Sequence, residues 1–402
     1  MTTLLYLPEG STLLAERWLA AQPAEARVFL LHEYGMADAA RTLTEKYRFI
    51  QDHALMPGSA GAENEALRAR LASIERAVLP VAPGSYPLIF QEPAAIPDIR
   101  PYYPLVRRLW TLGVRHFEIC NLGGSFAFSV PHLLDEFVNR HRGRRCFVVG
   151  NGPSLNQIDM SRLKDEITLG ANRGYLGFER WGFQFTYWGM IDWLQIEQYG
   201  PEYEAAIPAE TVKFVPYKYL PLLRFENACP MNTVYTPRPV FSERPDQLYR
   251  GHSVTYALIE AAAMMGCDPI ILVGIDHRYN LAEPWPQKTR RAIRQTLVRP
   301  IYDMPFYQGI RAWREARSHA KKQGQARPAL WSAADAGEPT HFDDKYTGGQ
   351  HKQFMMPYPR ESERDYRCAL AWARRHGRRI LNATPGSALQ VFPKVAFDTL
   401  FR

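Results

Sequence analysis

The stretch Arg144–Leu155, with the sequence RRCFVVGNGPSL, is the part of the sequence that best predicts the fold. Its run Cys146–Val149 is short, apolar and rich in β-formers, as in a strand buried on both faces of a parallel sheet. Residues 150–154 (GNGPS) follow at once, so the strand opens into a glycine-rich loop. Ligands of open α/β sheets bind beyond the carboxyl ends of the strands. The stretch therefore predicts a ligand site at this loop, although an ordinary strand–helix turn would have the same pattern.

The residues of the loop indicate what kind of ligand it takes. Gly150 and Gly152 lack a side chain, which lets a ligand approach the backbone closely. Asn151 and Ser154 add short polar side chains at the mouth of the loop. Leu155 stands where the GxGxxG pattern of dinucleotide-binding proteins has its third glycine. NAD and FAD are therefore disfavoured, and a mononucleotide is favoured.

The rest of the chain predicts further strands on either side of this loop. In the C-terminal part they cover residues 167–172, 185–190, 211–216, 269–275 and 379–383. We expect an α/β fold with a Rossmann-like, doubly wound and mostly parallel sheet over residues 141–402. Residues 216–245 contain six prolines and predict an irregular excursion, and residues 281–339 are polar and rich in arginine, as in an inserted basic lid.

The first 140 residues predict a smaller α/β accessory domain in which we find no chemistry. Strands are expected over 27–31 and 114–120. A stripe of apolar residues predicts a helix over 62–78, and a second amphipathic helix is expected over 130–140.

Polar residues gather at the predicted mouth of the sheet. Hydrogen-bonding side chains and a glycine follow the strands or open a helix there, and they suit a base and a ribose: Asn151, Ser154, Asn172, Asp192, Ser253, Thr255, Gly274 and Asp276. Ser253, Val254 and Thr255 begin a helix, whose free N–H groups form an anion site. For each residue singly, capping of a helix or turn is the alternative interpretation.

The loop 339–349 supplies the candidate general base, His341, because histidine titrates near neutral pH. A structural histidine is the alternative, and His351, His277 and His252 compete for the role.

Composition limits the class of protein. The 402 residues carry a net charge of +8 and a pI of about 9.2, which suits an acidic ligand or an anionic membrane surface and does not by itself indicate nucleic acid. Five scattered cysteines without a CxxC pair indicate a reducing cytoplasm and no zinc site. The start of the chain has no signal-peptide pattern, and no apolar run is long enough to span a membrane. There is no P-loop and no DxD at a strand end, so no bound metal is expected.

Several motifs together resemble a known superfamily. They are GNGPSL (150–155), the strand ending at Asn172, GHSVTY (251–256), VGIDHRY (273–279), the THF and YTGG loop (340–349), and NAT with VFP (382–393). They are similar to a family long described only as a domain of unknown function, with the motility accessory glycosyltransferases of flagellin and the MptE-like pterin diphosphokinases. The first half also resembles small bacterial sialyltransferases, which use CMP-sialic acid without a metal on a modified Rossmann fold. The resemblance covers residues 140–402.

The resemblance implies a metal-independent, inverting glycosyltransferase that moves an acidic 3-deoxy sugar from a CMP-activated donor to a glycan, lipid-linked glycan or protein hydroxyl. It implies that Asn151, Gly152 and Asn172 contact the nucleotide and that residues 253–255 hold the base or ribose. Asp276 and Tyr279 would lie near the ribose and phosphate, and His341 would be the base. For the tyrosine that contacts the phosphate, Tyr302, Tyr307 and Tyr346 compete with Tyr279. The expected location is the cytoplasm, with peripheral contact at the inner membrane as a further expectation. The alternatives are an ATP- and Mg²⁺-dependent pterin diphosphokinase-like phosphotransferase and a nucleotide-binding scaffold without catalysis.

Overall fold

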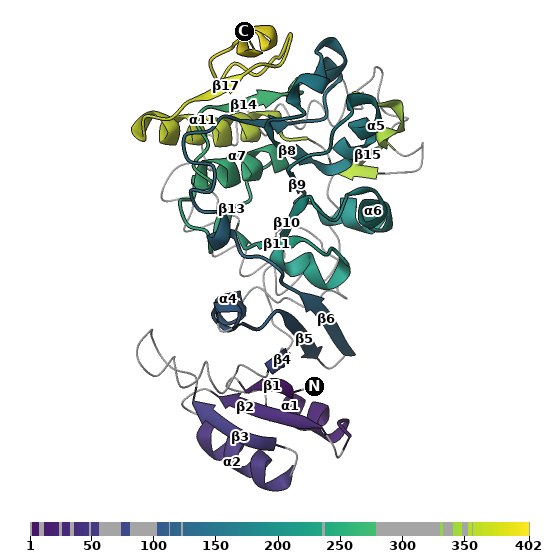
Figure 1. The fold of residues 1–402 in the computed structure, drawn as a ribbon, viewed down its shortest axis with the longest axis vertical. Helices are drawn as coiled ribbons and strands as arrows, with labels where there is room; N and C mark the ends of the chain where they lie inside the picture. Colours follow the sequence, from purple (N-terminus) through teal and green to yellow (C-terminus); the bar gives the residue numbers. More distant parts are fainter. Residues whose placement is uncertain are drawn as a thin grey trace, which may run out of the picture.

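The computed structural model describes most of the chain as two sheets and the helices that cover them (Figure 1). The described residues are 2–7, 12–23, 26–32, 36–47, 50–55, 74–80, 103–111, 113–121, 124–234, 238–278, 330–332, 341–347, 353–355 and 357–401. The helix predicted over 62–78 lies outside the described residues up to residue 73, and so does nearly all of the predicted lid over 281–339.

The larger sheet has seven strands, all parallel. In spatial order they are β11 (Ala228–Met231), β10 (Val212–Pro216), β9 (Tyr187–Gly189), β8 (Ile167–Ala171), β7 (Cys146–Val149), β14 (Ile270–Val273) and β17 (Ile380–Asn382). The chain moves outward from β7 to β11 and then returns to the other side of β7. The strand order thus reverses between β7 and β14, the point where doubly wound sheets bind ligands. The predicted Rossmann-like fold class is confirmed.

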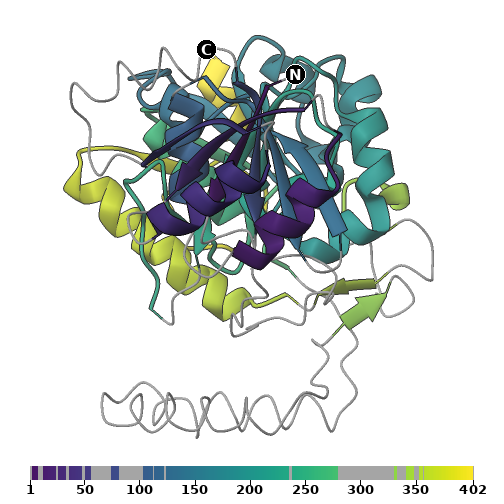
Figure 2. The same cartoon turned by 90° about the horizontal axis from the view of Figure 1, so that it is seen from below.

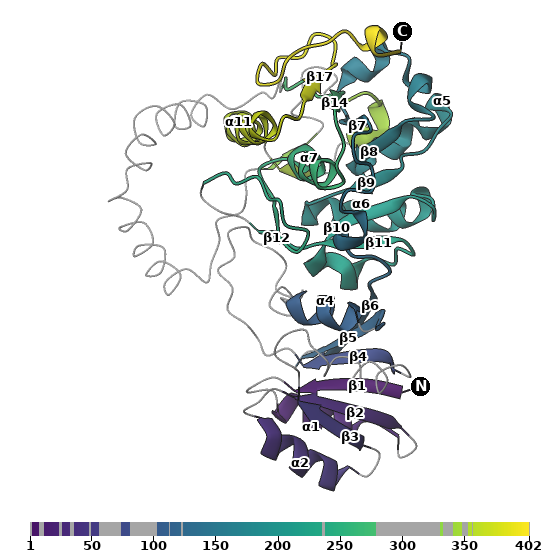
Figure 3. The same cartoon turned by 60° about the vertical axis from the view of Figure 1, so that its left-hand side comes forward.

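Helices cover both faces of this sheet, as Figure 3 shows. On one face lie α5 (Phe178–Trp181) and α6 (Trp193–Ala206), and on the other lie α7 (Val254–Met264) and α11 (Pro359–Arg375). Strand β7 alternates between the two cores: Phe147 and Val149 pack on the α6 side, and Cys146 and Val148 on the α7 side. Because both faces are buried, the strand is apolar throughout, which is why its sequence was diagnostic.

The second sheet belongs to the N-terminal part of the chain. Its order is β3 (Ile50–Leu55), β2 (Arg27–His32), β1 (Thr2–Leu7), β4 (Ile74–Pro80), β5 (His116–Asn121) and β6 (Gly124–Ser129). Only the pair of β5 and β6 is antiparallel. Helices α1 (Thr12–Ala20) and α2 (Ala37–Lys46) pack on one face, where Figure 2 shows them in purple. Helix α4 (Tyr103–Thr111) leads into β5.

Short elements complete the described residues. The strands are β12 (Thr233–Val234), β13 (Leu248–Tyr249), β15 (Leu330–Ser332) and β16 (Gln353–Met355). The 3₁₀ turns are η3 (Leu134–Phe137), η4 (Pro153–Gln157), η5 (Met160–Leu163), η6 (Asn172–Gly177), η7 (Tyr217–Leu222), η10 (Asp344–Thr347) and η11 (Phe397–Phe401).

Three sequence-based expectations about elements are wrong. A helix was expected over 62–78, but its last residues, from Ile74 on, form the central strand β4. Ala77 and Val78 of this strand are both fully buried, and they face different cores. Over 130–140 only η3 is helical, and Asn139 leaves the helical region with φ 58°. The excursion over 216–245 contains β11, where Pro230 is tolerated because β11 is an edge strand.

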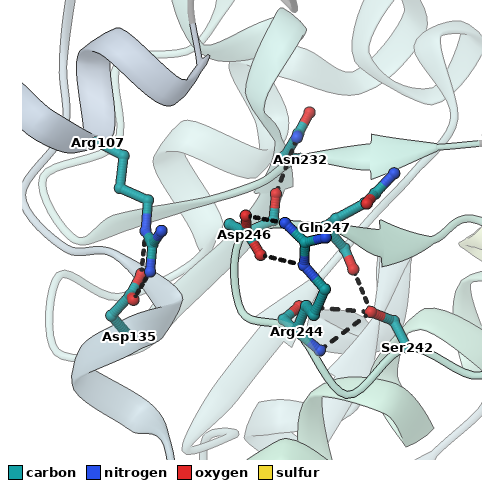
Figure 4. A network of polar contacts seen from close by, with 7 residues as sticks. All are labelled: Arg107, Asp135, Asn232, Ser242, Arg244, Asp246 and Gln247. Atoms are coloured by element: carbon teal, nitrogen blue, oxygen red, sulfur yellow. Dashed lines mark hydrogen bonds and ion pairs between the residues drawn. The ribbon is translucent and has the colours of Figure 1, made fainter. Parts of the chain in front are cut away.

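The two sheets share a continuous apolar core and a polar rim. The ring of Tyr217 contacts Tyr103 with centroids 4.9 Å apart and Phe128 at 6.1 Å. At the rim, shown in Figure 4, Arg107 of α4 pairs with Asp135, and Arg244 pairs with Asp246 at 2.6 Å. The Asp135 carboxylate raises the pKa of Arg107, and the charge of Asp246 acts in the same direction. Among the described residues, no helix is long and apolar enough to cross a bilayer.

Candidate functional site

The loops after β7 and β14 pack directly on each other at the point of strand-order reversal. Gly150 N donates to Val273 O at 2.8 Å, and Gly152 N donates to Gly274 O at 2.9 Å. A Cβ atom on Gly150 would lie 2.4 Å from Gly274 O, and one on Gly152 would lie 1.8 Å from Asp276 Oδ2. The two glycines were expected to make room for a ligand. In the structure they make room for residues 274–276.

Asp276 ties the two loops together through its carboxylate. Ser154 Oγ donates to Asp276 Oδ2 at 2.6 Å, and Ser154 N donates to Oδ1 at 3.2 Å. Burial raises the pKa of Asp276, and the bonds from Ser154 act in the opposite direction. Five predicted site residues (Gly150, Gly152, Ser154, Gly274 and Asp276) thus form one contiguous group.

A second group forms around Asn151, on the β8 side of the same loop. Asn151 Nδ2 donates to Ala171 O at 3.0 Å and to Tyr346 Oη at 3.2 Å, and Asn151 O accepts from Phe342 N. The His341 ring stacks on Tyr346 with centroids 3.7 Å apart and planes 9° apart. The structure therefore brings the predicted histidine and tyrosine to the glycine-rich loop from almost 200 residues away.

The environment of His341 favours the neutral imidazole. Burial lowers the pKa of His341 to about 3, and the positive charge of Arg173 adds to the effect. A histidine with this pKa is a weak base in the unliganded protein. A bound anion beside the ring would raise the pKa, because negative charge stabilises the imidazolium form.

Arg173 is a residue that sequence reasoning did not single out. It is 4% exposed, although arginine is rarely buried. Its guanidinium donates to Lys345 O and Tyr346 O, pairs with Glu202 at 2.6 Å and lies 4.4 Å from the centroid of the Tyr199 ring. Arg173 thus holds residues 341–347 against η6 and α6. The available signal was its place directly after Asn172, at the end of a buried strand.

Asn172 combines an unusual backbone with a buried polar atom. Its φ is 45°, in the left-handed region, and its carbonyl oxygen accepts from Trp188 Nε1 at 2.7 Å. The Oδ1 atoms of Asn151 and Asn172 are both buried and have no hydrogen-bond partner among the described residues. Buried acceptors are normally satisfied, and strained backbone concentrates at functional sites. Two buried amide oxygens that no described residue satisfies, beyond adjacent strands, mark this edge of the sheet as a place for a hydrogen-bond donor.

The start of α7 is connected to the loop after β14 by contacts with Tyr366 of α11. Ser253 Oγ accepts from Thr255 N at 3.2 Å, which caps α7 at Val254, and also accepts from Tyr366 Oη at 3.3 Å. The Tyr366 ring lies 6.4 Å from that of His277, the residue after Asp276. Capping, the alternative interpretation of Ser253, is therefore observed.

Asp192 is likewise a cap, since its side chain accepts from Leu194 N at 2.9 Å at the start of α6. Tyr279, Tyr302, Tyr307 and His351 lie outside the described residues. Among the described residues, no group of three or more His, Cys, Asp or Glu side chains could hold a metal ion.

Comparison with known proteins adds one family match and one structural likeness. No curated protein matches the chain. A MAf glycosyltransferase from Magnetospirillum magneticum AMB-1 is similar in structure with a TM-score of 0.36 and 12% identity, over 98% of this chain and 57% of that chain. Residues 121–281 match the family model described as 6-hydroxymethylpterin diphosphokinase MptE-like. The match runs from the end of β5 to just beyond β14. The chain is therefore similar to the MptE-like family over the segment that carries the glycine-rich loop, α7 and Asp276.

Proposed function

We propose that the chain is a glycosyltransferase that takes an acidic 3-deoxy sugar from a CMP-activated donor. The observation that carries the nucleotide part is the pair of buried amide oxygens of Asn151 and Asn172, neither of which has a hydrogen-bond partner within the described part of the chain. An amide oxygen accepts from amino and hydroxyl groups, and a nucleoside offers both. Their position beyond β7 and β8, beside the reversal of strand order, is the expected place for such a ligand.

The choice of cytidine and of an acidic sugar is supported by the motif resemblance to sialyltransferases. In the proposed reaction the bond between the anomeric carbon and the phosphate oxygen breaks, and CMP leaves with the electron pair. The acceptor hydroxyl forms the new bond from the opposite face, so the anomeric configuration inverts, and its proton passes to a histidine at this edge. We propose no resident metal and no other cofactor. The acceptor is a glycan, lipid-linked glycan or protein hydroxyl.

A ligand panel read by thermal shift tests the donor class. The probes are CMP, CMP-N-acetylneuraminic acid, a UDP-sugar, a GDP-sugar, and ATP with Mg²⁺. We expect the two cytidine compounds to raise the melting temperature and the UDP- and GDP-sugars to leave it unchanged, because ligand that binds only the folded state stabilises it. Stabilisation by ATP with Mg²⁺ alone would reverse the choice of donor.

Two matched variants test the site itself. Asn172→Gly keeps the left-handed backbone but removes the acceptor oxygen, and we expect it to weaken CMP binding at least tenfold. Asn139→Gly makes the same change at φ 58° in the turn that precedes β7, and we expect it to leave binding unchanged. Equal effects of the two variants would show that Asn172 does not contact the nucleotide.

The second candidate function is an ATP-dependent diphosphokinase-like transfer, which the MptE-like family match favours. This reaction would need Mg²⁺, since ATP-dependent phosphoryl transfer relies on metal ions that neutralise phosphate charge. Full activity in EDTA would exclude it. A scaffold without catalysis is separated by a different result, namely CMP binding without CMP release from any CMP-sugar.

A further inference from the structure

A histidine–carboxylate pair lies at the start of α7, separate from His341. His252 Nδ1 lies 2.8 Å from Asp365 Oδ2, and His252 N donates to the same oxygen at 2.9 Å. The Asp365 side chain is 0% exposed, and that of His252 is 9% exposed. Asp365 comes from the second turn of α11, so the pair joins two helices on one face of the large sheet.

The pair fixes the tautomer of the imidazole. An ionised carboxylate only accepts hydrogen bonds, so Nδ1 carries the proton and Nε2 is left as the basic nitrogen. This is the arrangement by which a buried carboxylate orients a catalytic histidine and stabilises its charged form. The backbone is shaped around the carboxylate: Gly251 has φ 60°, and a Cβ atom there would lie 3.2 Å from Asp365 Oδ2.

The pair lies on the side of the sheet where ligands bind. The end of α7 contacts the turn before β7, since Asn139 N donates to Met264 O and Gly143 N to Gly266 O. The start of α7 therefore points toward the carboxyl ends of the strands. Tyr366, next to Asp365, contacts both Ser253 and His277 and so connects the pair to the loop after β14.

We propose that His252, positioned by Asp365, is the general base that takes the proton from the acceptor hydroxyl. The inference rests on the proposed function, because it needs an acceptor and an activated donor. In the step, the acceptor O–H bond breaks and its proton moves to His252 Nε2. The acceptor oxygen bonds to the anomeric carbon, and the electron pair of the broken C–O bond leaves on the CMP phosphate.

The properties of the two histidines divide the roles between them. His341 stacks on Tyr346 beside Asn151, where burial and Arg173 lower its pKa to about 3. At neutral pH the His341 imidazole is therefore uncharged and a weak base, so it is better suited to packing against a nucleotide than to accepting a proton. For His252, the ion pair among the described residues is the one with the buried Asp365 carboxylate, which holds the imidazole in one orientation.

An exposed aromatic side chain beside His252 fits a sugar acceptor. Tyr358, directly before α11, is 37% exposed, and its ring lies 5.9 Å from that of His252. The face of such a ring makes apolar contact with the C–H groups of a sugar, while its hydroxyl group remains in contact with solvent. The charge of Asp365 also acts on four described titratable groups around the pair, Tyr256 and Glu260 of α7 and Tyr366 and Cys368 of α11, and burial raises the pKa of each. Tyr358 packs beside the His252 ring, and His277 lies beside Tyr366 and pairs with Glu363 of α11 at 3.5 Å.

The test measures CMP release from CMP-N-acetylneuraminic acid, with water or glycerol as acceptor, across pH. His252→Ala is expected to lower kcat at least 100-fold, with CMP affinity by calorimetry within twofold and with recovery when imidazole is added. Asp365→Asn is expected to lower kcat at least tenfold while CMP affinity stays within twofold, because the carboxylate orients the imidazole and does not bind the nucleotide. His376→Ala removes a histidine paired with Glu243 at the far end of α11 and is expected to change neither quantity.

Three outcomes would overturn the assignment. The first is a His252→Ala enzyme with wild-type kcat, and the second is loss and imidazole rescue of kcat in His341→Ala instead. The third is independent of activity: ¹⁵N NMR of the wild-type protein showing His252 protonated on Nε2 rather than Nδ1. If the wild-type protein binds CMP but releases none from the donor, the proposed function fails, while the NMR result still decides the tautomer and hence the pair.

Discussion

Replacing Gly152 by alanine should damage the junction of the two loops through sterics alone. Gly152 has φ −72° and ψ 156°, a backbone that any residue adopts, so alanine meets no conformational penalty there. Its Cβ would lie 1.8 Å from Asp276 Oδ2 and 2.9 Å from Gly274 O. The carboxylate cannot simply swing away, because Ser154 Oγ and N hold it.

The magnitude follows from these two contacts. Overpacking in a tight site costs about 1–3 kcal/mol, and loss of hydrogen bonds to a charged group costs about 1.5–3 kcal/mol. We therefore expect Gly152→Ala to lower the free energy of unfolding by about 3–5 kcal/mol. Urea unfolding measures the loss, and hydrogen exchange of peptides from β7 and β14 locates it in the large sheet.

Two further variants make the reasoning refutable. Gly182→Ala, where a Cβ meets nothing within 4 Å but φ is +72°, measures the backbone cost alone and should lose only about 1–2 kcal/mol. In an Asp276→Ala background, Gly152→Ala should lose at least about 1 kcal/mol less than it does alone, because the main clash is gone. An equal loss in both backgrounds would show that Asp276 is not what excludes a side chain at position 152.

Three other predictions concern the surroundings of the site. His341→Phe should remove an acid sensitivity. Burial lowers the pKa of His341 in the folded protein to about 3, whereas in the unfolded chain it has its ordinary value of 6.5. Between these pH values the unfolded chain therefore binds one proton that the folded protein does not. As the pH drops from 6.5 to 3, His341 lowers the free energy of unfolding by up to about 1.4 kcal/mol per pH unit. An unchanged slope in urea midpoints would contradict this. Arg173→Met removes the hydrogen bonds to the backbone of residues 345 and 346, so it should speed amide exchange in residues 341–347 at least tenfold. The control Arg162→Met, which breaks an exposed ion pair with Asp398, should leave these exchange rates unchanged. Equal exchange rates in the two variants would refute the anchoring role of Arg173. Asp192→Ala should lower stability by about 1 kcal/mol and Asp192→Ser should restore most of it, since both Asp and Ser cap helices; failure of serine to restore it would mean that Asp192 does more than cap α6.

Much of the large sheet could be predicted because its strands are buried on both faces. Cys146–Val149 and Ile270–Val273 are apolar at every position, and the glycines that follow them mark the ends. Strand β4 could not be recognised from the same signal. Its buried residues 77 and 78 face different cores, and an apolar stripe leading up to it fits a helix as well as a strand.

The site shows the same division between local and tertiary information. Asn151, Asn172 and Asp276 could be found because they follow strands, and the loop 341–347 because of its composition. Arg173 and Asp365 could not, since a lone arginine, or one acid in a charged helix, normally lies on the surface. Only the packing of distant segments, α6 with η10 for Arg173 and α7 with α11 for Asp365, makes them buried partners.

The contact that secures residues 341–347 is made to the peptide backbone. Arg173 reaches the carbonyl oxygens of Lys345 and Tyr346, while the side chains of Asp344 and Lys345 face solvent. Carbonyl groups are present whatever the amino acid, so this segment keeps its position when those two residues are exchanged. Related proteins could thus vary the exposed side chains of this segment, and with them the molecules that they bind, while keeping the hydrogen bonds from Arg173 to its backbone.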